Sequence, residues 1–202
     1  RDRSVSRGLG DVYKRQSYSG KITFDGKECK YHTINDSEAD GIVIIHQELA
    51  LSPFLSIAEN IFIGNEQAKG GVIDWDKTRA EAKKLLDRVG LPEDPDTKVM
   101  DIGVGKQQLV EIAKALSKDV KLLILDEPTR GIDVGAKRDI YLLLGKLVQQ
   151  GKAVIMISSE IPELMGVCDR IMVMCEGNLS GEVQRDAFSQ ERIMTLASAI
   201  EV

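Results

Sequence analysis

Short apolar runs alternate along the chain with longer stretches in which apolar residues recur at helical spacing. The short runs predict strands and the longer stretches predict helices, and this alternating order is typical of an α/β domain. Strands are expected at 41–45, 122–125 and 153–157, helices at 56–64, 77–89, 107–117, 135–149, 161–166 and 189–200, and β-hairpins at 19–31 and 170–183. The order contains no repeat of fixed period.

The run Leu122–Leu125 is the most informative of these patterns. Four apolar residues without alternation predict a strand buried on both faces, as in a parallel sheet. Asp126 and Glu127 follow at its carboxyl end, where open α/β sheets place their ligand sites. Because adjacent strand residues point to opposite faces, the two carboxylates are expected to have different roles. The structural alternative is a core strand that ends in a solvated acidic turn.

Composition narrows the class of protein. A chain of 202 residues with 43% hydrophobic content can build one α/β domain with a real core. A net charge of −5 gives no basic stripe, which argues against nucleic acid as a partner. No stretch approaches the roughly 20 apolar residues that cross a bilayer. Three widely spaced cysteines, Cys29, Cys168 and Cys175, predict reduced thiols rather than a disulfide or a zinc site.

The first sixteen residues differ in style from the rest of the sequence. They are rich in Arg, Ser and Gly, show no apolar periodicity, and lack the apolar core of a targeting peptide. Ser6–Gln16 matches, over eleven consecutive residues, the conceptual translation of a transposase-type sequencing adapter. We therefore expect residues 1–16 to be a non-native adapter-like segment and give them no functional role.

The string L-L-I-L-D-E-P-T at Leu122–Thr129 resembles the Walker B strand of ATP-binding cassette (ABC) ATPases. The resemblance covers residues 17–202 and implies an ABC-type P-loop NTPase fold with a β-hairpin edge, a helical subdomain at about 49–117, and ATP and Mg²⁺ as cofactors. It implies that Asp126 holds the metal and that Glu127 polarises the attacking water. Gln47, just after a strand, resembles the Q-loop glutamine, which senses Mg²⁺ and the γ-phosphate in the family.

The string I-G-V-G-K-Q-Q resembles the ABC signature loop, whose family form is L-S-G-G-Q. Glycines let backbone N–H groups approach phosphate oxygens, and the start of the following helix adds positive partial charge. Here a glycine replaces the serine, a valine replaces one glycine and a lysine replaces the glutamine, so one hydroxyl donor is lost. Lys106 either compensates electrostatically or is a solvated lysine at a helix start. The candidate nucleotide-binding residues of this loop are Gly103, Val104, Gly105, Lys106 and Gln107.

Two further positions follow from the resemblance. Asp133 stands in the D-loop, which lies at the dimer seam and couples the two nucleotide sites, and it is also a good N-cap for the helix that follows. Ser159 occupies the slot of the switch histidine, which contacts the γ-phosphate in the family. A serine hydroxyl is shorter and carries no charge, so that role is weakened here.

The largest departure from the family is the phosphate-binding loop. Walker A requires G-x-x-x-x-G-K-[ST], and residues 17–202 contain no such string. The motif belongs roughly 20 residues before the first hairpin, where the adapter-like segment stands. The resemblance therefore implies an incomplete ABC domain without the Walker A strand and helix, and we expect the chain alone to be inactive.

The local style narrows the resemblance to ATP-binding subunits of bacterial monosaccharide importers of the ribose, xylose or galactose type. These proteins carry two fused ABC domains. Residues 17–129 resemble the first domain and residues 130–202 the second, so Leu125–Thr129 is a candidate junction of a chimera. The alternative is one divergent ABC domain.

The resemblance also implies partners. They are the transmembrane permease subunits of a sugar importer, a second ABC domain and, indirectly, a sugar-binding protein, at the cytoplasmic face of the membrane. The apolar segment Leu51–Gly64 is expected to receive the permease, although its residues also suit a helical core. Two other functions stay open: a non-transport ABC protein acting on ribosomes or DNA, and a non-catalytic interaction module of the same fold.

Overall fold

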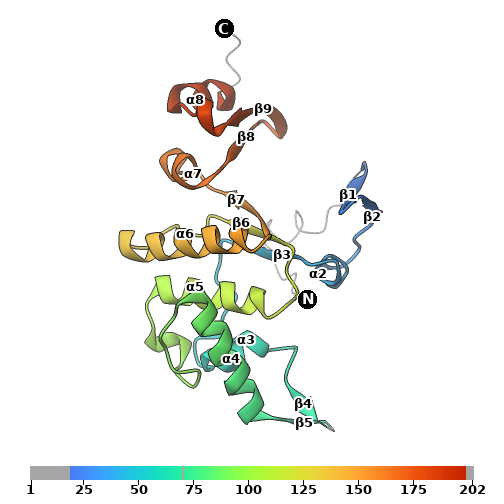
Figure 1. Cartoon of the computed structure of the whole chain (residues 1–202), viewed down its shortest axis with the longest axis vertical. Helices are drawn as coiled ribbons and strands as arrows, with labels where there is room; N and C mark the ends of the chain where they lie inside the picture. The colour runs from blue at the N-terminus through green and yellow to red at the C-terminus, as the bar shows by residue number, and fades with distance from the viewer. Residues whose placement is uncertain (1–18, 70, 199–202) are drawn as a thin grey trace, which may run out of the picture. The chain divides into compact units, whose positions relative to one another are not determined.

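The computed structural model describes residues 19–69 and 71–198 of the chain, and the adapter-like segment lies outside them (Figure 1). The helices are α2 (Ile34–Ala39), α3 (Ile57–Phe62), α4 (Trp75–Val89), α5 (Val104–Leu116), α6 (Val134–Gln149), α7 (Ile161–Val167) and α8 (Gln190–Ala197). The strands are β1 (Ile22–Phe24), β2 (Lys27–Cys29), β3 (Ile42–Ile45), β4 (Ala68–Lys69), β5 (Val72–Ile73), β6 (Leu122–Asp126), β7 (Ala153–Ile157), β8 (Arg170–Cys175) and β9 (Asn178–Gln184). The chain divides into two units between Asp36 and Ser37.

The first unit contains the predicted β-hairpin of β1 and β2. The strands pair antiparallel, with Ile22 opposite Cys29 and Phe24 opposite Lys27. The two turn residues, Asp25 and Gly26, both have positive φ, at 50° and 74°. Asp-Gly is the sequence that two-residue turns of this handedness favour, so local sequence alone sets the register of this hairpin.

The second unit is built on a parallel sheet in the order β3-β6-β7. Helix α5 packs against β3 and helix α6 against β7 (Figure 1). The buried side chains between them, among them Val43, Leu123, Leu125 and Leu147, form the main hydrophobic core. The α/β class and the parallel sheet predicted from the sequence are therefore confirmed.

The expectation that the central strand is buried on both faces is wrong. Residues that share a row across the sheet also share a face, and Ile44, Ile124 and Ile155 form one such row. Ile44 and Ile155 are each 48% exposed, and Ile157, two residues further along the same face, is 50% exposed. Only the opposite face is covered by α5 and α6. The apolar run at Leu122–Leu125 therefore belongs to a sheet with one covered face. Among the described residues, no helix covers the other face.

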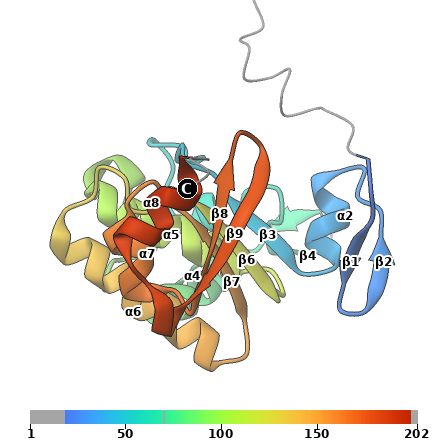
Figure 2. The same ribbon diagram turned by 90° about the horizontal axis from the view of Figure 1, so that it is seen from above.

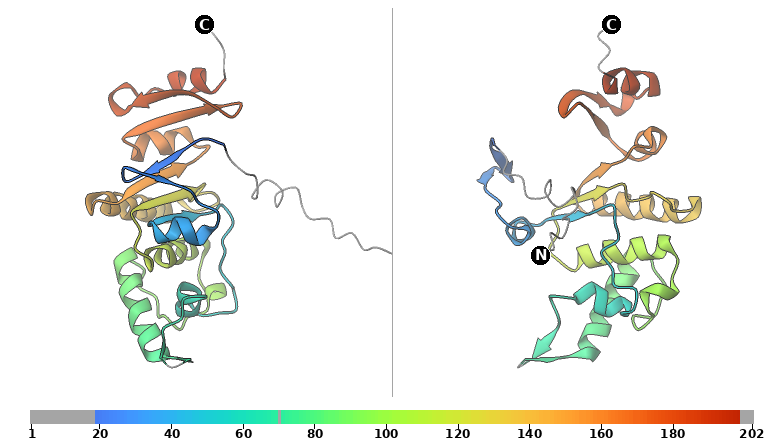
Figure 3. Two further views of the ribbon diagram at one scale, coloured as in Figure 1. Left: turned by 90° about the vertical axis from the view of Figure 1, so that its right-hand side faces the viewer. Right: turned by 180° about the vertical axis from the view of Figure 1, so that it is seen from behind.

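Helices α3, α4 and α5 pack on one another and correspond to the predicted helical subdomain (Figure 3). Capping groups explain where α3 begins and where α4 begins and ends. Ser56 and Glu59 form a reciprocal capping box at the start of α3: the Ser56 N–H donates to Glu59 at 2.7 Å, and the Glu59 N–H donates to the Ser56 hydroxyl at 3.2 Å. Asp74 caps α4 by accepting from the Lys77 N–H, and Gly90 ends that helix in the left-handed conformation.

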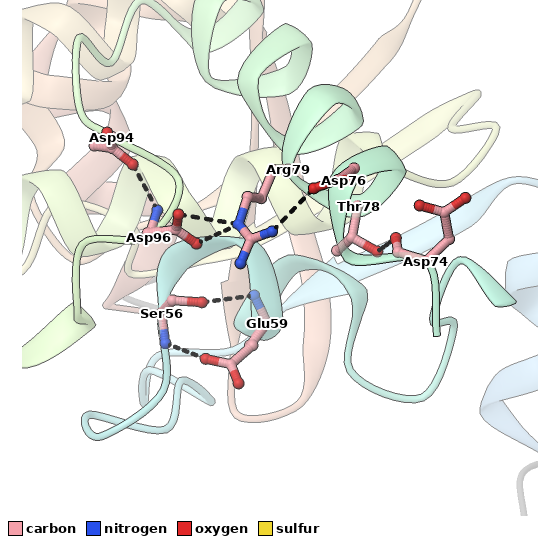
Figure 4. A network of polar contacts seen from close by, with 8 residues as sticks. All are labelled: Ser56, Glu59, Asp74, Asp76, Thr78, Arg79, Asp94 and Asp96. Atoms are coloured by element: carbon pink, nitrogen blue, oxygen red, sulfur yellow. Dashed lines mark hydrogen bonds and ion pairs between the residues drawn. The ribbon is translucent and has the colours of Figure 1, made fainter. Parts of the chain in front are cut away.

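The start of α4 is tied to the loop that follows the helix. The Arg79 guanidinium donates to both carboxylate oxygens of Asp96, at 2.8 and 3.0 Å, and also lies 3.4 Å from Asp76 (Figure 4). Asp94 in turn accepts from the Asp96 N–H at 2.9 Å. This network orders the surface of the helical subdomain where α3 and α4 begin.

Strands β8 and β9 form an antiparallel hairpin with α8 against it (Figure 2). Ile171, Val173, Val183 and Ile193 make a second, smaller core. The predicted hairpin at 170–183 is confirmed. The helix predicted to 200 is observed to Ala197, and residues from 199 onward lie outside the described part of the chain.

One helix start needs correction, and three short elements were not predicted. Helix α5 begins at Val104, so Val104–Lys106 form its first turn rather than the expected loop. Helix α2 was not predicted because it has no buried residue and so leaves no apolar periodicity. The two-residue strands β4 and β5 are too short to leave a pattern. No helix among the described residues is long and apolar enough to cross a membrane.

Candidate functional site

The four predicted catalytic and metal-binding residues lie at one edge of the sheet. The strands run parallel, with Ile45 opposite Leu125 and Asp126 opposite Ile157, so the segments that follow β3, β6 and β7 emerge side by side. The structure therefore places Gln47, the Asp126–Glu127 pair and Ser159 along the same edge. Gln47 and Ser159 are exposed, and both carboxylates are half-buried.

Glu127 is held in an unusual backbone conformation. Its φ is +47°, in the left-handed region that non-glycine residues occupy at a cost. Its N–H donates to the Ile157 carbonyl at 2.8 Å, and its Oε1 accepts from the Ser159 N–H at 2.9 Å. The carboxylate is thus fixed to the loop after β7 rather than left as a solvated acidic turn.

Asp126 is the last residue of β6 and, by strand alternation, lies on the same face as Ile124. Glu127 follows the strand with a left-handed backbone, so strand alternation does not extend to it, and its carboxylate binds the β7 loop. The described residues contain no group of three or more His, Cys, Asp or Glu that could hold a metal by itself. One carboxylate with a nearby glutamine suits Mg²⁺, which commonly takes one or two protein ligands and completes its shell with water and phosphate oxygens.

The segment after Gln47 is tied to α5. The N–H of Ala50 donates to Oε1 of Glu111 at 2.8 Å. Burial raises the pKa of the Glu111 carboxyl above its usual 4.5, against the opposing influences of Lys114 and of the bond from Ala50. A buried carboxylate thus anchors the chain three residues beyond the candidate Q-loop glutamine.

The signature-like residues lie at the start of α5. Gly103 is the N-cap and makes no side-chain cap, so the first N–H groups of the helix have no partner within the helix. Lys106 forms an ion pair with Glu93 at 2.5 Å. The Gln107 amide donates to the carbonyls of Val99 and Ile102, at 3.1 and 3.0 Å. Both side chains are thereby engaged within the subdomain.

Asp133 caps α6, accepting from the Ala136 N–H at 3.0 Å, as the capping interpretation predicted. The start of α6 lies close against the start of α5. A Cβ placed on Gly105 would meet the Cβ of Ala136 at 2.4 Å and Ile132 at 3.3 Å. Gly105 is therefore required for helix packing, which is a structural role that the resemblance did not include.

Sequence reasoning missed a set of polar residues beside this edge. Glu163 on α7 is buried, and its carboxylate accepts hydrogen bonds from the hydroxyls of Thr129, Tyr141 and Ser158. These residues come from separate elements and share no local pattern. The one available signal was that Thr129 and Ser158 follow the ends of two adjacent parallel strands within three residues.

A parallel sheet with helices on one face and two carboxylates at its carboxyl edge is an α/β arrangement in which ligands bind at that edge. The model of the ABC transporter family matches residues 12–130, more than half of the chain. The protein therefore belongs to the ABC transporter family.

Curated relatives agree with this assignment. The chain is 51% identical over 193 residues to the L-arabinose transport ATP-binding protein AraG of Geobacillus stearothermophilus, covering 95% of this chain and 38% of that protein. It is 45% identical over 193 residues to the xylose import ATP-binding protein XylG of Moorella thermoacetica, covering 96% and 38%. The chain thus spans less than two fifths of the length of these relatives.

Solved structures show the same fold. The ATP-binding cassette MJ1267 of an ABC transporter superposes with a TM-score of 0.76 at 22% identity, covering 88% of this chain and 76% of that one. The protein cbiO1 of Clostridium perfringens, part of the transporter complex cbiONQ, gives a TM-score of 0.71 at 27% identity, covering 87% and 70%. The predicted ABC-type P-loop NTPase fold is confirmed.

Proposed function

We propose that this chain is part of the ATP-hydrolysing subunit of a sugar importer. The proposal rests on the names of its relatives, which transport L-arabinose or import xylose. The structural observation that carries it is the Glu127 carboxylate, held at 2.9 Å to the Ser159 N–H at the carboxyl edge of the sheet. A carboxylate fixed in this way can accept a proton from water and orient it.

Each site residue has a proposed role. Asp126, with Gln47, holds Mg²⁺, through water molecules in part. When bound, Mg²⁺ neutralises charge on the β- and γ-phosphates of ATP. Glu127 orients the attacking water. The first N–H groups of α5, at Val104–Lys106, face the phosphates of a nucleotide bound to a second ABC domain, whereas the Gln107 N–H donates to the Gly103 carbonyl.

Asp133 lies at the seam between the two domains. Ser159 marks the switch position, where its backbone N–H, rather than its hydroxyl, makes the contact that the structure records.

Partners follow from the same proposal. The segment Leu51–Gly64 divides into two parts: Ile57 and Ile61 are buried in the helical core, whereas Phe54 is 72% exposed. Phe54 and Trp75 line a hollow of about 300 Å³ on the helical subdomain. We propose that this surface receives a transmembrane permease subunit at the cytoplasmic face of the membrane, with a sugar-binding protein acting on the permease from the other side.

We propose further that the domain as given is incomplete. Residues 17–202 contain no G-x-x-x-x-G-K-[ST] string, and the sheet face that carries Ile44, Ile155 and Ile157 has no cover among the described residues. An apolar face of this kind normally packs against a further layer. The missing layer fits a Walker A strand and helix. The chimera junction at Leu125–Thr129 remains our interpretation of the mixed sequence style, against a single divergent domain.

ATP hydrolysis tests this function. The 202-residue chain is expected to show no hydrolysis, whereas the same chain extended by the natural upstream sequence is expected to hydrolyse Mg-ATP. Glu127→Gln in the extended protein is the matched control and is expected to abolish turnover while leaving nucleotide binding in place. Turnover by the unextended chain would overturn the proposed incompleteness, and activity of the Glu127→Gln variant would overturn the proposed role of Glu127. Long sequencing reads across the locus test the junction.

A further inference from the structure

Glu163 on α7 is a carboxylate with little solvent contact and three hydroxyl donors. Its residue exposure is 8%. Oε2 accepts from the Ser158 hydroxyl at 2.5 Å, and Oε1 accepts from Tyr141 at 2.5 Å and from Thr129. No buried side-chain polar atom in the described residues is left without a hydrogen-bond partner, and this includes the buried polar atoms around Glu163.

The three donors come from segments that surround the candidate catalytic carboxylate. Thr129 lies two residues after Glu127, in the turn that ends β6, and is 1% exposed. Ser158 is the first residue after β7, and its hydroxyl also accepts from the Glu160 N–H at 3.1 Å. Tyr141 belongs to α6. Glu163 is therefore the common partner of the β6 turn, the β7 loop and the helix between them.

The charge state of Glu163 fits this arrangement. Burial acts against ionisation, but the bonds from Ser158, Thr129 and Tyr141 and the charge of Lys137 outweigh it, so the pKa of Glu163 lies below its usual 4.5. Burial and the bond to Glu163 raise the pKa of Tyr141 above its usual 10.0. At neutral pH an ionised carboxylate thus faces three protonated hydroxyls, and an ionised acceptor strengthens each bond.

We propose that Glu163 is a positioning residue that holds the loop Ser158–Ser159 against the turn Glu127–Thr129 and thereby fixes the Glu127 carboxylate. The link is direct. Glu163 fixes the Ser158 side chain, and the next residue, Ser159, donates its N–H to Glu127. The left-handed backbone at Glu127 needs such support, because a strained residue keeps its conformation only where its surroundings impose it. The catalytic role of Glu127 rests on the proposed function, but the positioning of Glu127 by Glu163 through Ser158 and Ser159 does not.

Amide hydrogen exchange of the 202-residue chain, followed residue by residue by NMR, tests the link without nucleotide. The variants are Glu163→Ala, which removes the shared partner, and Ser158→Ala, which removes only the bond to the β7 loop. The control is Glu160→Gln, which removes a carboxylate from the same loop and breaks its surface pair with Lys137 but leaves the Glu163 cluster intact. The exchange rate of the Leu123 amide in β6 measures the stability of the sheet.

In both test variants the Ser159 amide is expected to exchange about tenfold faster relative to the Leu123 amide. A change of this size corresponds to the loss of one stabilising hydrogen bond. In Glu160→Gln the ratio is expected to stay unchanged. Equal acceleration of Ser159 and Leu123, or no change at Ser159, would overturn the proposal, since a purely structural Glu163 lowers the stability of all these amides together. If Glu163→Ala does not fold, Ser158→Ala alone decides. Because ATP is absent, failure of this test is separate from failure of the proposed ATPase function.

Discussion

The backbone N–H of Ser159 donates to the Glu127 carboxylate at 2.9 Å and thereby joins the segments that follow two neighbouring parallel strands, β6 and β7. The Glu127 N–H donates back to the Ile157 carbonyl at 2.8 Å. The two bonds join the β6 turn to the β7 loop through backbone as well as side-chain groups. Any change in the β7 loop is therefore expected to reach the carboxylate that we propose orients water.

The backbone conformation of Glu127 predicts an inverted glycine effect. At φ +47° a Cβ is unfavourable, so Glu127→Gly is expected to be more stable than Glu127→Ala by about 1 kcal/mol. Both variants lose the carboxylate, so their difference isolates the backbone. At the neighbouring strand residue, Asp126→Gly is expected to be less stable than Asp126→Ala by roughly 0.5–1 kcal/mol. Urea unfolding of the four variants measures both differences, and the same sign at both positions would contradict the conformation described.

The contact between Gly105 and Ala136 predicts a steric clash with a specific rescue. Gly105→Ala is expected to destabilise the protein by about 1–3 kcal/mol, because the added methyl group would stand 2.4 Å from the Ala136 Cβ. Ala136→Gly in the same chain is expected to restore part of that loss. Gly145→Ala, also in a helix but with open space around it, is the control and is expected to stabilise by up to about 1 kcal/mol. A double-mutant cycle by urea unfolding gives the coupling, and additivity would count against the contact.

The raised pKa of Glu111 predicts a pH-dependent loss of stability. The folded protein holds the Glu111 proton more tightly than the unfolded chain, so this group contributes stability that is fully present below pH 4.5 and is lost as pH rises through its folded pKa. Glu111→Gln keeps an oxygen that can accept from Ala50 but does not ionise. The difference in unfolding free energy between wild type and variant is expected to shift against wild type as pH rises from 4 to 8. A pH-independent difference would show that Glu111 titrates normally.

The capping box at α3 predicts a modest cost for losing one hydroxyl. Ser56→Ala removes the acceptor of the Glu59 N–H and is expected to lower the free energy of unfolding by about 1 kcal/mol. Ser56→Asp retains a capping oxygen and is the control. Thermal or urea unfolding distinguishes them. Equal losses in the two variants would contradict the assignment of this free energy to the side-chain cap.

Local signals in the sequence predicted much of the secondary structure. The Asp25–Gly26 turn, the stop at Gly90 and the strands β3, β6 and β7 depend on neighbours in the chain, and each was found close to its expected place. The elements that were missed, α2 and the β4–β5 hairpin, bury too little apolar surface to leave a pattern. The start of α5 was placed too late because Gly103–Gly105 was interpreted as a loop, whereas packing against Ala136 stabilises a helix there.

The sequence by itself determined the family, the order of the main strands and helices, and the residues that stand at the ends of parallel strands, because these depend on residue type and on spacing along the chain. The tertiary structure decided which groups meet. It showed that one face of the central sheet lies open, that Lys106 pairs with Glu93, and that Glu163 joins Thr129, Tyr141 and Ser158 beside Glu127. Such contacts join residues far apart in the chain, and their geometry follows from how the strands and helices pack.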